Sequence, residues 1–160
     1  MVEVTVHGVT GSSRSHKWVV ILRERRARRY LPIWISRFAA KAIAIGMQKA
    51  ERSRPLTHDL LKAVIEKLGA KVSHIYINDR IDKTLQAKIV VAHAGQYVKL
   101  DSRPSDAIAL ALRVGAPIFV AEALMERVAV ATKSEHTGVS AEEREKLAVF
   151  ADFLNTLDSE

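Results

Sequence analysis

Two Ser-Arg-Pro turns, each followed directly by polar residues, are the clearest candidates for chemistry in this chain. Ser53-Arg54-Pro55 leads into Leu56-Thr57-His58-Asp59, and Ser102-Arg103-Pro104 leads into Ser105-Asp106. Proline in the first turn with short polar residues beside it is typical of a helix start, where backbone N–H groups without helical partners can bind an anion. The pattern therefore predicts two helix starts that carry both cationic and acidic side chains.

These residue types suit the hydrolysis of a phosphodiester bond. Arginine and hydroxyl groups at a helix start can hold phosphate, and we assign this role to Arg54, Arg103 and Ser105. Carboxylates can hold a divalent cation such as Mg²⁺ or Mn²⁺, which activates water and stabilises the leaving oxygen. The candidate metal ligands are Asp101 and Asp106, and the candidate catalytic residues are His58, Asp59, Asp101 and Asp106. The alternative is that these residues only begin their helices, as Pro, Ser, Thr and Asp commonly do.

A second cationic feature lies between two predicted strands, where arginines crowd a turn. Its candidate phosphate-binding residues are Arg25, Arg26, Arg28 and Arg29. If this tip faces a nucleic-acid groove, it is dense enough to contact several phosphates. The alternative is an ordinary solvated turn, which Glu24 and the tip position also explain.

Composition indicates one soluble domain. A chain of 160 residues with 48% hydrophobic and 27% charged residues can bury one core. The lack of cysteine excludes a disulfide framework, a thiolate zinc site and a cysteine nucleophile. No secretory signal or membrane span is recognisable, so we expect a cytoplasmic protein that does not bind membranes.

Charge is distributed unevenly along the chain. Residues 1–132 contain 22 Lys and Arg against 11 Asp and Glu, whereas residues 133–160 contain 3 against 7. A basic body raises the local concentration of polyanions, which favours DNA or RNA as a partner. The acidic tail can shield that surface within the same chain.

Hydrophobic periodicity predicts an α+β fold with mixed β-sheets and packed helices. The predicted strands span residues 2–6, 17–23, 30–35, 72–78, 85–92, 97–101 and 117–120. The predicted helices span residues 36–49, 57–68, 104–113, 122–127 and 140–157, with Thr57 as the N-cap of the second. We expect residues 1–131 to form the domain and residues 132–160 to form an acidic linker and a C-terminal helix.

The two halves of the body also resemble each other. Placing Lys41–Gln48 over Asp106–Arg113 matches Ala-Ile-Ala in both segments. We interpret this as a possible duplication of a unit of three strands and one helix, the alternative being that short Ala/Ile helices match by chance.

Several motifs together resemble the bifunctional nuclease domain family. They are Leu31-Pro32-Ile33-Trp34-Ile35, Arg54-Pro55-Leu56-Thr57-His58-Asp59-Leu60, the run from Asp101 to Arg113 (DSRPSDAIALALR), and Ala116-Pro117-Ile118-Phe119-Val120. The resemblance covers about residues 1–130. It implies a single α+β domain, a homo-oligomer (a dimer or trimer), and, in some members, nuclease activity on DNA and RNA. Its motif positions include His58, Asp59, Asp101, Arg103, Ser105 and Asp106, whose roles rest on the chemistry above.

The sequence is therefore compatible with three functions. The first is a nuclease assisted by a divalent metal, and the second is a non-catalytic oligomeric module that binds nucleic acid or an anionic ligand through the same helix ends. The third is a structural or regulatory protein whose acidic tail docks a partner.

Overall fold

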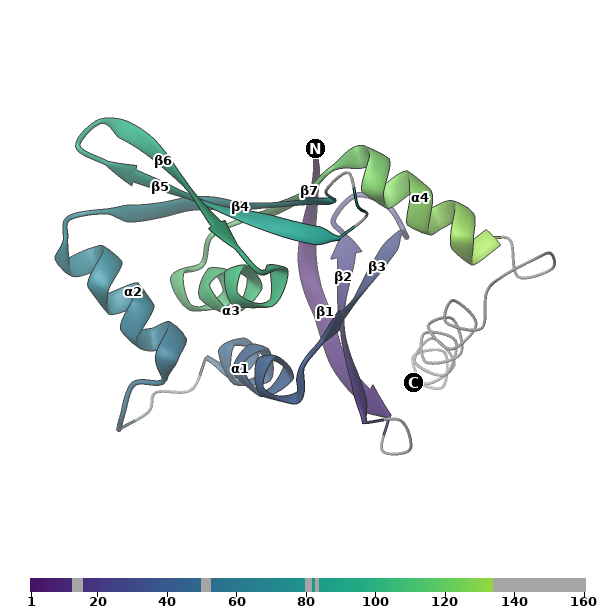
Figure 1. The fold of residues 1–160 in the computed structure, drawn as a ribbon, viewed down its shortest axis with the longest axis horizontal. Coiled ribbons are helices and arrows are strands. Elements are labelled where there is room, and N and C mark those ends of the chain that lie inside the picture. The colour runs from purple at the N-terminus through teal and green to yellow at the C-terminus, as the bar shows by residue number, and fades with distance from the viewer. Residues whose placement is uncertain (13–15, 50–52, 80–81, 83, 134–160) are drawn as a thin grey trace.

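The computed structural model describes residues 1–12, 16–49, 53–79, 82 and 84–133, which form four helices and seven strands (Figure 1). The strands are β1 (Val2–Ser12), β2 (Lys17–Glu24), β3 (Tyr30–Ile35), β4 (Lys71–Asp79), β5 (Leu85–His93), β6 (Gln96–Ser102) and β7 (Ile118–Val120). The helices are α1 (Arg37–Gln48), α2 (Thr57–Lys67), α3 (Pro104–Val114) and α4 (Glu122–Lys133). The predicted helix at residues 140–157 lies outside the described residues.

The strands form one mixed sheet in the order β3-β2-β1-β7-β4-β5-β6. The short strand β7 joins its two halves, because it pairs antiparallel with β1 and parallel with β4. All other pairings are antiparallel between neighbours in sequence. The α+β class is confirmed, with a single mixed sheet in the described part of the chain.

Each half of the sheet is a three-stranded meander that leads towards a helix. The first meander continues directly into α1, and the second continues into α3. This arrangement matches the predicted unit of three strands and one helix. The duplication itself stays a prediction, since a shared order of elements does not establish a common origin.

Helix α3 lies at the centre of the fold, where it contacts β4 and β5 of the sheet and the helices α1 and α2 (Figure 1). The run Ala107–Ala111 is at most 1% exposed, because alanines let neighbouring backbones approach while Ile108 and Leu110 fill the core. Gly115 ends the helix in the left-handed conformation, with φ +69°. The start of α3, which carries the second Ser-Arg-Pro turn, is therefore anchored by a rigid, buried helix.

Helix α2 packs beside α3 but buries none of its residues. Thr57 was predicted as its N-cap, yet the N-cap position is held by Leu56 and Thr57 is the first helical residue. The reason is that the Asp59 carboxylate accepts the backbone N–H of Leu56 at 2.8 Å, so an acid within the first turn supplies the capping hydrogen bond.

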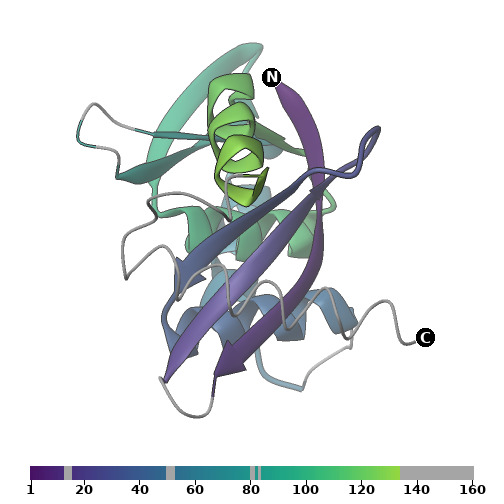
Figure 2. The same ribbon diagram turned by 90° about the vertical axis from the view of Figure 1, so that its right-hand side faces the viewer.

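Helix α4 packs against β3 at the far end of the molecule from α2, as the turned view in Figure 2 also shows. Leu124 and Met125 anchor it in the core, at 2% and 1% exposure. The helix continues to Lys133, beyond the predicted end at residue 127. Of the described helices, none combines the length and apolar character that crossing a membrane requires.

Candidate active site

The two helix starts singled out above meet at a hydrogen-bonded cluster of His58, Asp106 and Arg103. The Nε2 atom of His58 lies 3.1 Å from Oδ1 of Asp106, and Nε of Arg103 donates to Oδ2 of Asp106 at 2.8 Å. The cluster forms where the first turn of α2 packs against α3, because His58 reaches Asp106 in the first turn of α3. The structure thus brings together three of the candidate residues at the two helix starts.

Exposure within this cluster is graded from the imidazole to the guanidinium. The side chains of His58, Asp106 and Arg103 are 13%, 33% and 78% exposed. Burial acts to raise the pKa of Asp106, but the hydrogen bonds from Arg103 and His58 outweigh it and hold that pKa below its ordinary value. Asp106 is therefore an ionised acceptor that orients both neighbours.

One ring nitrogen of His58 remains for proton transfer. Within the described part of the chain, its contact with Asp106 uses Nε2, and no hydrogen bond reaches Nδ1. When Nε2 carries the proton towards Asp106, Nδ1 has a free lone pair. The arrangement can therefore fix the tautomer of a general base.

Asp59 has a different setting from His58, because both of its oxygens hold other parts of the fold. Its Oδ2 accepts the N–H of Leu56, and its Oδ1 accepts Nε of Arg113 at 2.9 Å. Arg113 is 5% exposed and also donates to the carbonyls of Ala109 and Ala42. Asp59 therefore ties the start of α2 to the end of α3 and to α1.

A cavity of about 540 Å³ lies beside this tie, between α1, α2 and the end of α3. Asp59 and Arg113 line it together with Lys49 and Lys62. His58 and Asp106 are not among its lining residues. The cluster of His58, Asp106 and Arg103 therefore does not line this cavity, and Arg103 is its most exposed member.

The remaining candidates at the two turns differ in exposure and in partners. The Asp101 side chain is 73% exposed and is paired with Lys88 on β5. Ser105 is 9% exposed, and Arg54 is exposed in the turn before α2. Among the described residues, no group of three or more His, Asp or Glu side chains is arranged to hold a metal ion. The expected cation ligands, Asp101 and Asp106, thus belong to two separate ion pairs.

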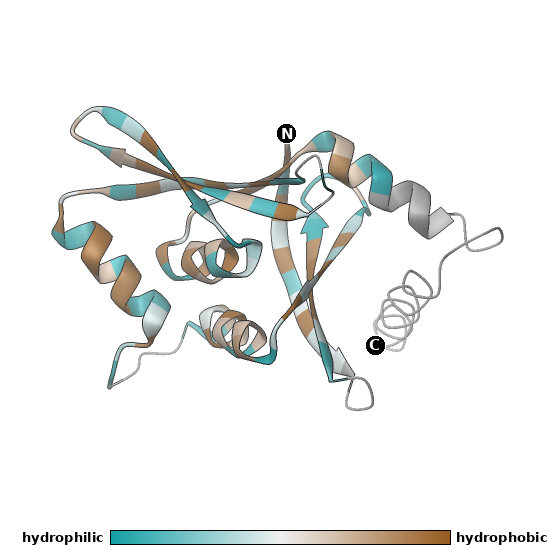
Figure 3. Cartoon of the chain, in the orientation of Figure 1, coloured by the Kyte–Doolittle hydropathy of each residue, from teal (hydrophilic) through white to brown (hydrophobic). Residues whose placement is uncertain are grey.

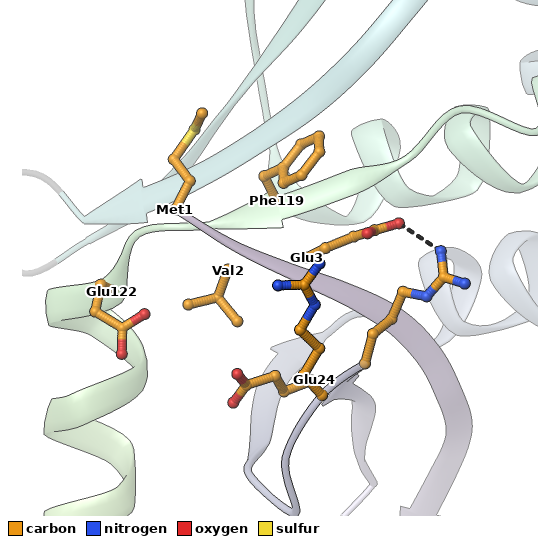
Figure 4. Close-up of a pocket in the computed structure, with 8 residues that line it drawn as sticks. Met1, Val2, Glu3, Glu24, Phe119 and Glu122 are labelled. Carbon is orange, nitrogen blue, oxygen red and sulfur yellow. Dashed lines mark hydrogen bonds and ion pairs between the residues drawn. The ribbon is translucent and has the colours of Figure 1, made fainter.

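The arginine-rich tip between β2 and β3 is partly neutralised. Arg25 pairs with Glu3 at 2.8 Å, and Arg29 pairs with Glu24 and Glu122 at 2.5 and 2.8 Å. The hydrogen bonds that Arg29 donates to Glu24 and then to Glu122 raise the pKa of Arg29. A hollow of about 330 Å³ lies beside the tip. Figure 4 shows Glu3, Glu24 and Glu122 among the residues that line it, with a dashed line for the ion pair of Glu3 with Arg25.

The other two tip arginines differ from this pair. Arg26 and Arg28 are exposed, and Arg26 lines the same hollow. Of the four candidate phosphate-binding residues at the tip, these two therefore have the charge most accessible to a partner.

Arg113 and Lys62 were not among the predicted site residues. The Nζ atom of Lys62 donates to the carbonyl of Arg113 at 3.3 Å, next to the pairing of Arg113 with Asp59. One signal was present in the sequence: Arg113 directly follows the apolar run Ala107–Leu112, and a charged group on a buried helix needs partners. Its partner Asp59 is 54 residues away, so pattern alone could not identify it.

Comparison with known proteins now supplies a family. The bifunctional nuclease domain matches residues 20–133. An uncharacterized protein of Mycobacterium tuberculosis (strain H37Rv) is 36% identical over 159 residues, which cover 98% of this chain and 95% of that protein. Bifunctional nuclease 2 of Oryza sativa subsp. japonica and Bifunctional nuclease 1 of Arabidopsis thaliana are each 28% identical over 66% of this chain, and over 34% and 33% of their own lengths. Because the domain match covers more than half of the sequence, the chain belongs to the bifunctional nuclease domain family.

Proposed function

We propose that this protein hydrolyses phosphodiester bonds in DNA or RNA, with His58 as the proton-transfer residue. The observation that carries the proposal is the hydrogen-bonded set of His58, Asp106 and Arg103 at the paired starts of α2 and α3. Family membership and the names of the plant relatives support the reaction class. The basic body of the chain supports a polyanionic substrate.

His58 acts through Nδ1, because Nε2 faces Asp106. Nδ1 accepts a proton from the attacking water as the new bond to phosphorus forms, and the leaving oxygen takes a proton from solvent water as the old bond breaks on the opposite side of phosphorus. Asp106 is the positioning residue, since its ionised carboxylate favours the tautomer with Nε2 protonated and stabilises the imidazolium that follows. Asp59 is a structural residue in this scheme, because Leu56 and Arg113 already occupy its oxygens.

Arg103 binds the scissile phosphate in the proposal. Its Nε donates to Asp106, and this hydrogen bond directs the other two guanidinium nitrogens towards solvent. The Arg103 side chain is 78% exposed. A planar guanidinium matches the oxygens of a phosphate, and its charge offsets the negative charge that develops during the reaction. The exposure gradient therefore separates the roles: the half-buried end of the cluster orients the base, and the exposed end meets the substrate.

A divalent cation is not assigned a step. Asp106 has one oxygen facing His58 and the other facing Arg103, and Asp101 is paired with Lys88, so these two residues do not fit a shared site for Mg²⁺ or Mn²⁺. A requirement for metal is a separate expectation. It is tested by running the same cleavage assay with magnesium, with manganese and with EDTA.

The test measures cleavage of single- and double-stranded DNA and of RNA by the purified full chain and by its His58→Ala variant. We expect kcat/KM to fall by about 10²- to 10⁴-fold, the usual contribution of a general acid or base. His93→Ala, which changes an exposed histidine at the end of β5, is the matched control and should retain wild-type cleavage. Unchanged cleavage by His58→Ala would refute the assigned role.

The same assay separates the nuclease from a non-catalytic module that binds nucleic acid or another anion. Such a module would bind with salt-dependent affinity and show no turnover under any metal condition. Arg103→Ala would then weaken binding, whereas His58→Ala would leave affinity unchanged. For the nuclease, Arg103→Ala should lower kcat/KM as well.

A further inference from the structure

The side of the sheet that points away from α3 carries aromatic and basic side chains on β4, β5, β6 and β7. Ile75 and Ile89 pair with each other and belong to the core on the helix side, so the residues next to them in sequence point the other way. We call this opposite side of the four strands the outer face. Its aromatic rings and two of its lysines are His74, Tyr76, Tyr97, Phe119, Lys88 and Lys99.

The strand register fixes how these side chains lie beside one another. Tyr76 pairs with Phe119 on one side and with Lys88 on the other, so the three form a row across β7, β4 and β5. The His74 ring packs edge-on against the Phe119 ring, with centroids 5.8 Å apart. Aromatic rings thus form a platform on β7 and β4, and a lysine borders this platform on β5.

Strand β6 adds an exposed ring and a cation at the edge of the same face. Tyr97 is 70% exposed, and Lys99 is exposed two residues further along the strand. With strands about 4.8 Å apart and a rise of about 3.3 Å per residue, the Cα atoms of Tyr97 and Tyr76 are about 16 Å apart. A short run of nucleotides, which rise about 3.4 Å each when stacked, spans this distance.

The outer face is left open by the described helices. Helices α2 and α3 pack on the opposite side of this half of the sheet, and α4 packs chiefly on β3 at the other edge (Figure 1). Figure 3 shows hydrophilic and apolar residues mixed along β4, β5 and β6. A protein partner favours a continuous apolar patch, whereas rings separated by cations suit a polyanion that carries flat bases.

The charges of the outer face also favour an anionic partner. Asp101 pairs with Lys88, and Glu3 at the end of the row pairs with Arg25. These two carboxylates are therefore neutralised within the face. Among the described residues, Lys99 pairs with no carboxylate, so its charge is accessible to a ligand.

We propose that the outer face binds single-stranded nucleic acid, with bases stacked on Tyr97 and Tyr76 and a phosphate held by Lys99. This inference rests on the proposed function, because it names the form of the substrate and the surface that holds it. Every base has a flat side that an aromatic ring can cover, so the surface needs no particular base sequence. In a duplex the neighbouring base pairs already cover these sides.

Strand β6 connects this surface with the candidate active site. It is the edge strand of the sheet and leads directly into the start of α3, where Asp106 contacts His58. A single strand that crosses the outer face can therefore pass round this edge to the site. The outer face binds nucleotides away from the cleaved bond, so its variants should change KM and leave kcat as it is.

Fluorescence anisotropy of a labelled oligothymidylate of about 12 nucleotides tests the stacking, with the oligonucleotide checked for integrity on a gel. Tyr97→Ala should raise the dissociation constant about fivefold or more, the effect of losing one stacked base. Tyr97→Phe keeps the ring and should keep wild-type affinity. The matched control is Phe38→Ala, which removes an aromatic ring that is 84% exposed on α1 and should leave affinity unchanged. Wild-type affinity in Tyr97→Ala would refute the proposal.

Two further probes separate stacking from charge. An abasic oligonucleotide of the same length has phosphates without bases, and a duplex has its base faces covered, so Tyr97→Ala should bind both as the wild type does. Lys99→Ala should lower the slope of log Kobs against log salt by about 0.7 for the single strand, with Lys41→Ala on exposed α1 as the control. An equal loss of affinity by Tyr97→Ala for the abasic probe or the duplex would exclude stacking.

Cleavage of the same single strand keeps this inference apart from the proposed function. Tyr97→Ala should raise KM, whereas His58→Ala should lower kcat. If His58→Ala cleaves like the wild type while Tyr97→Ala loses affinity, the catalytic role fails and the outer face stands. If His58→Ala loses cleavage while Tyr97→Ala binds like the wild type, the outer face is refuted and the catalytic role stands.

Discussion

His58 and Asp106 join two helix starts that are 48 residues apart in the sequence, through a contact of 3.1 Å between Nε2 and Oδ1. This contact has structural weight because α2 buries none of its residues. Apolar packing of α2 rests on the partly buried Ile65, and polar contacts to α3 add to it. The site and the attachment of α2 therefore depend on the same side chains.

The first prediction concerns the pH dependence of stability. The pKa of Asp106 is lower in the folded protein than the ordinary value near 3.9. Its ionised form therefore stabilises the fold above about pH 4, and this contribution is lost as pH falls through the folded-state pKa. Asp106→Asn should lower the free energy of unfolding near pH 7 by more than it does near pH 3, as measured by urea denaturation.

The matched control for this prediction is Glu126→Gln, which removes one negative charge from an exposed position on α4. It should change stability by less than about 0.5 kcal/mol at neutral pH. If Asp106→Asn costs the same free energy at both pH values, the Asp106 carboxylate does not provide the stabilisation inferred from its hydrogen bonds.

The second prediction concerns Arg113, whose side chain is 5% exposed and contacts Asp59 and the carbonyls of Ala42 and Ala109. Arg113→Met leaves these acceptors without a donor, so the free energy of unfolding should fall by about 2–4 kcal/mol. Arg113→Lys should recover only part of the loss, because a single ammonium cannot reproduce the fork of a guanidinium. Arg37→Met, at the exposed start of α1, is the control; a loss below about 1 kcal/mol in Arg113→Met would contradict the role.

The third prediction concerns Gly46, where α1 approaches α3. An added Cβ would lie 2.9 Å from Nη1 of Arg113 and 3.1 Å from Cβ of Leu112. Crowding of this kind costs about 1–3 kcal/mol, which exceeds the gain of up to about 1 kcal/mol that alanine usually brings to a helix. Gly46→Ala should therefore destabilise the protein, as thermal unfolding would show, and a higher Tm would mean that α1 can shift without cost. Lys41→Ala on the exposed side of α1 is the control.

Much of the fold was predictable from local patterns, and the differences have identifiable causes. The predicted first strand ended at residue 6, yet β1 continues to Ser12. Gly8 and Gly11 are poor strand residues by propensity, but a Cβ at Gly11 would lie 2.6 Å from the Trp18 ring on β2. Glycine at position 11 thus leaves room for the Trp18 ring on the neighbouring strand, a requirement that no local sequence pattern reveals.

The candidate site was predictable only in part, because local patterns identify helix starts but not the contacts between distant segments. Helix-start chemistry identified His58, Arg103 and Asp106, which meet where the first turn of α2 packs against α3. Asp101 was expected to join Asp106, but it lies on the face of β6 opposite to the one that packs on α3, where Lys88 pairs with it. Alternation along a strand decides the face, and this depends on the strand register.

The fourth prediction concerns the arginine-rich tip and follows from the ion pairs of its members. Arg25 and Arg29 must give up glutamate partners to contact a phosphate, whereas Arg26 and Arg28 are exposed. If the tip contacts double-stranded DNA, the Arg26→Ala/Arg28→Ala double variant should reduce the slope of log Kobs against log salt by up to about 1.8, near 0.9 for each lost phosphate contact. The readout is fluorescence anisotropy of labelled DNA over a salt series.

Arg25→Ala is the matched control for this measurement, since it removes the same charge from the same tip but also frees Glu3. The charge of the freed Glu3 carboxylate counts for less than one full phosphate contact. Arg25→Ala should therefore change the slope by less than half as much as the double variant does. An equal change per arginine would mean that the ion pairs open on binding, and no change in either variant would mean that the tip is an ordinary solvated turn. In the last case the basic charge of the body must act elsewhere, and Arg103 at the start of α3 is then the cation most directly placed to meet a phosphate.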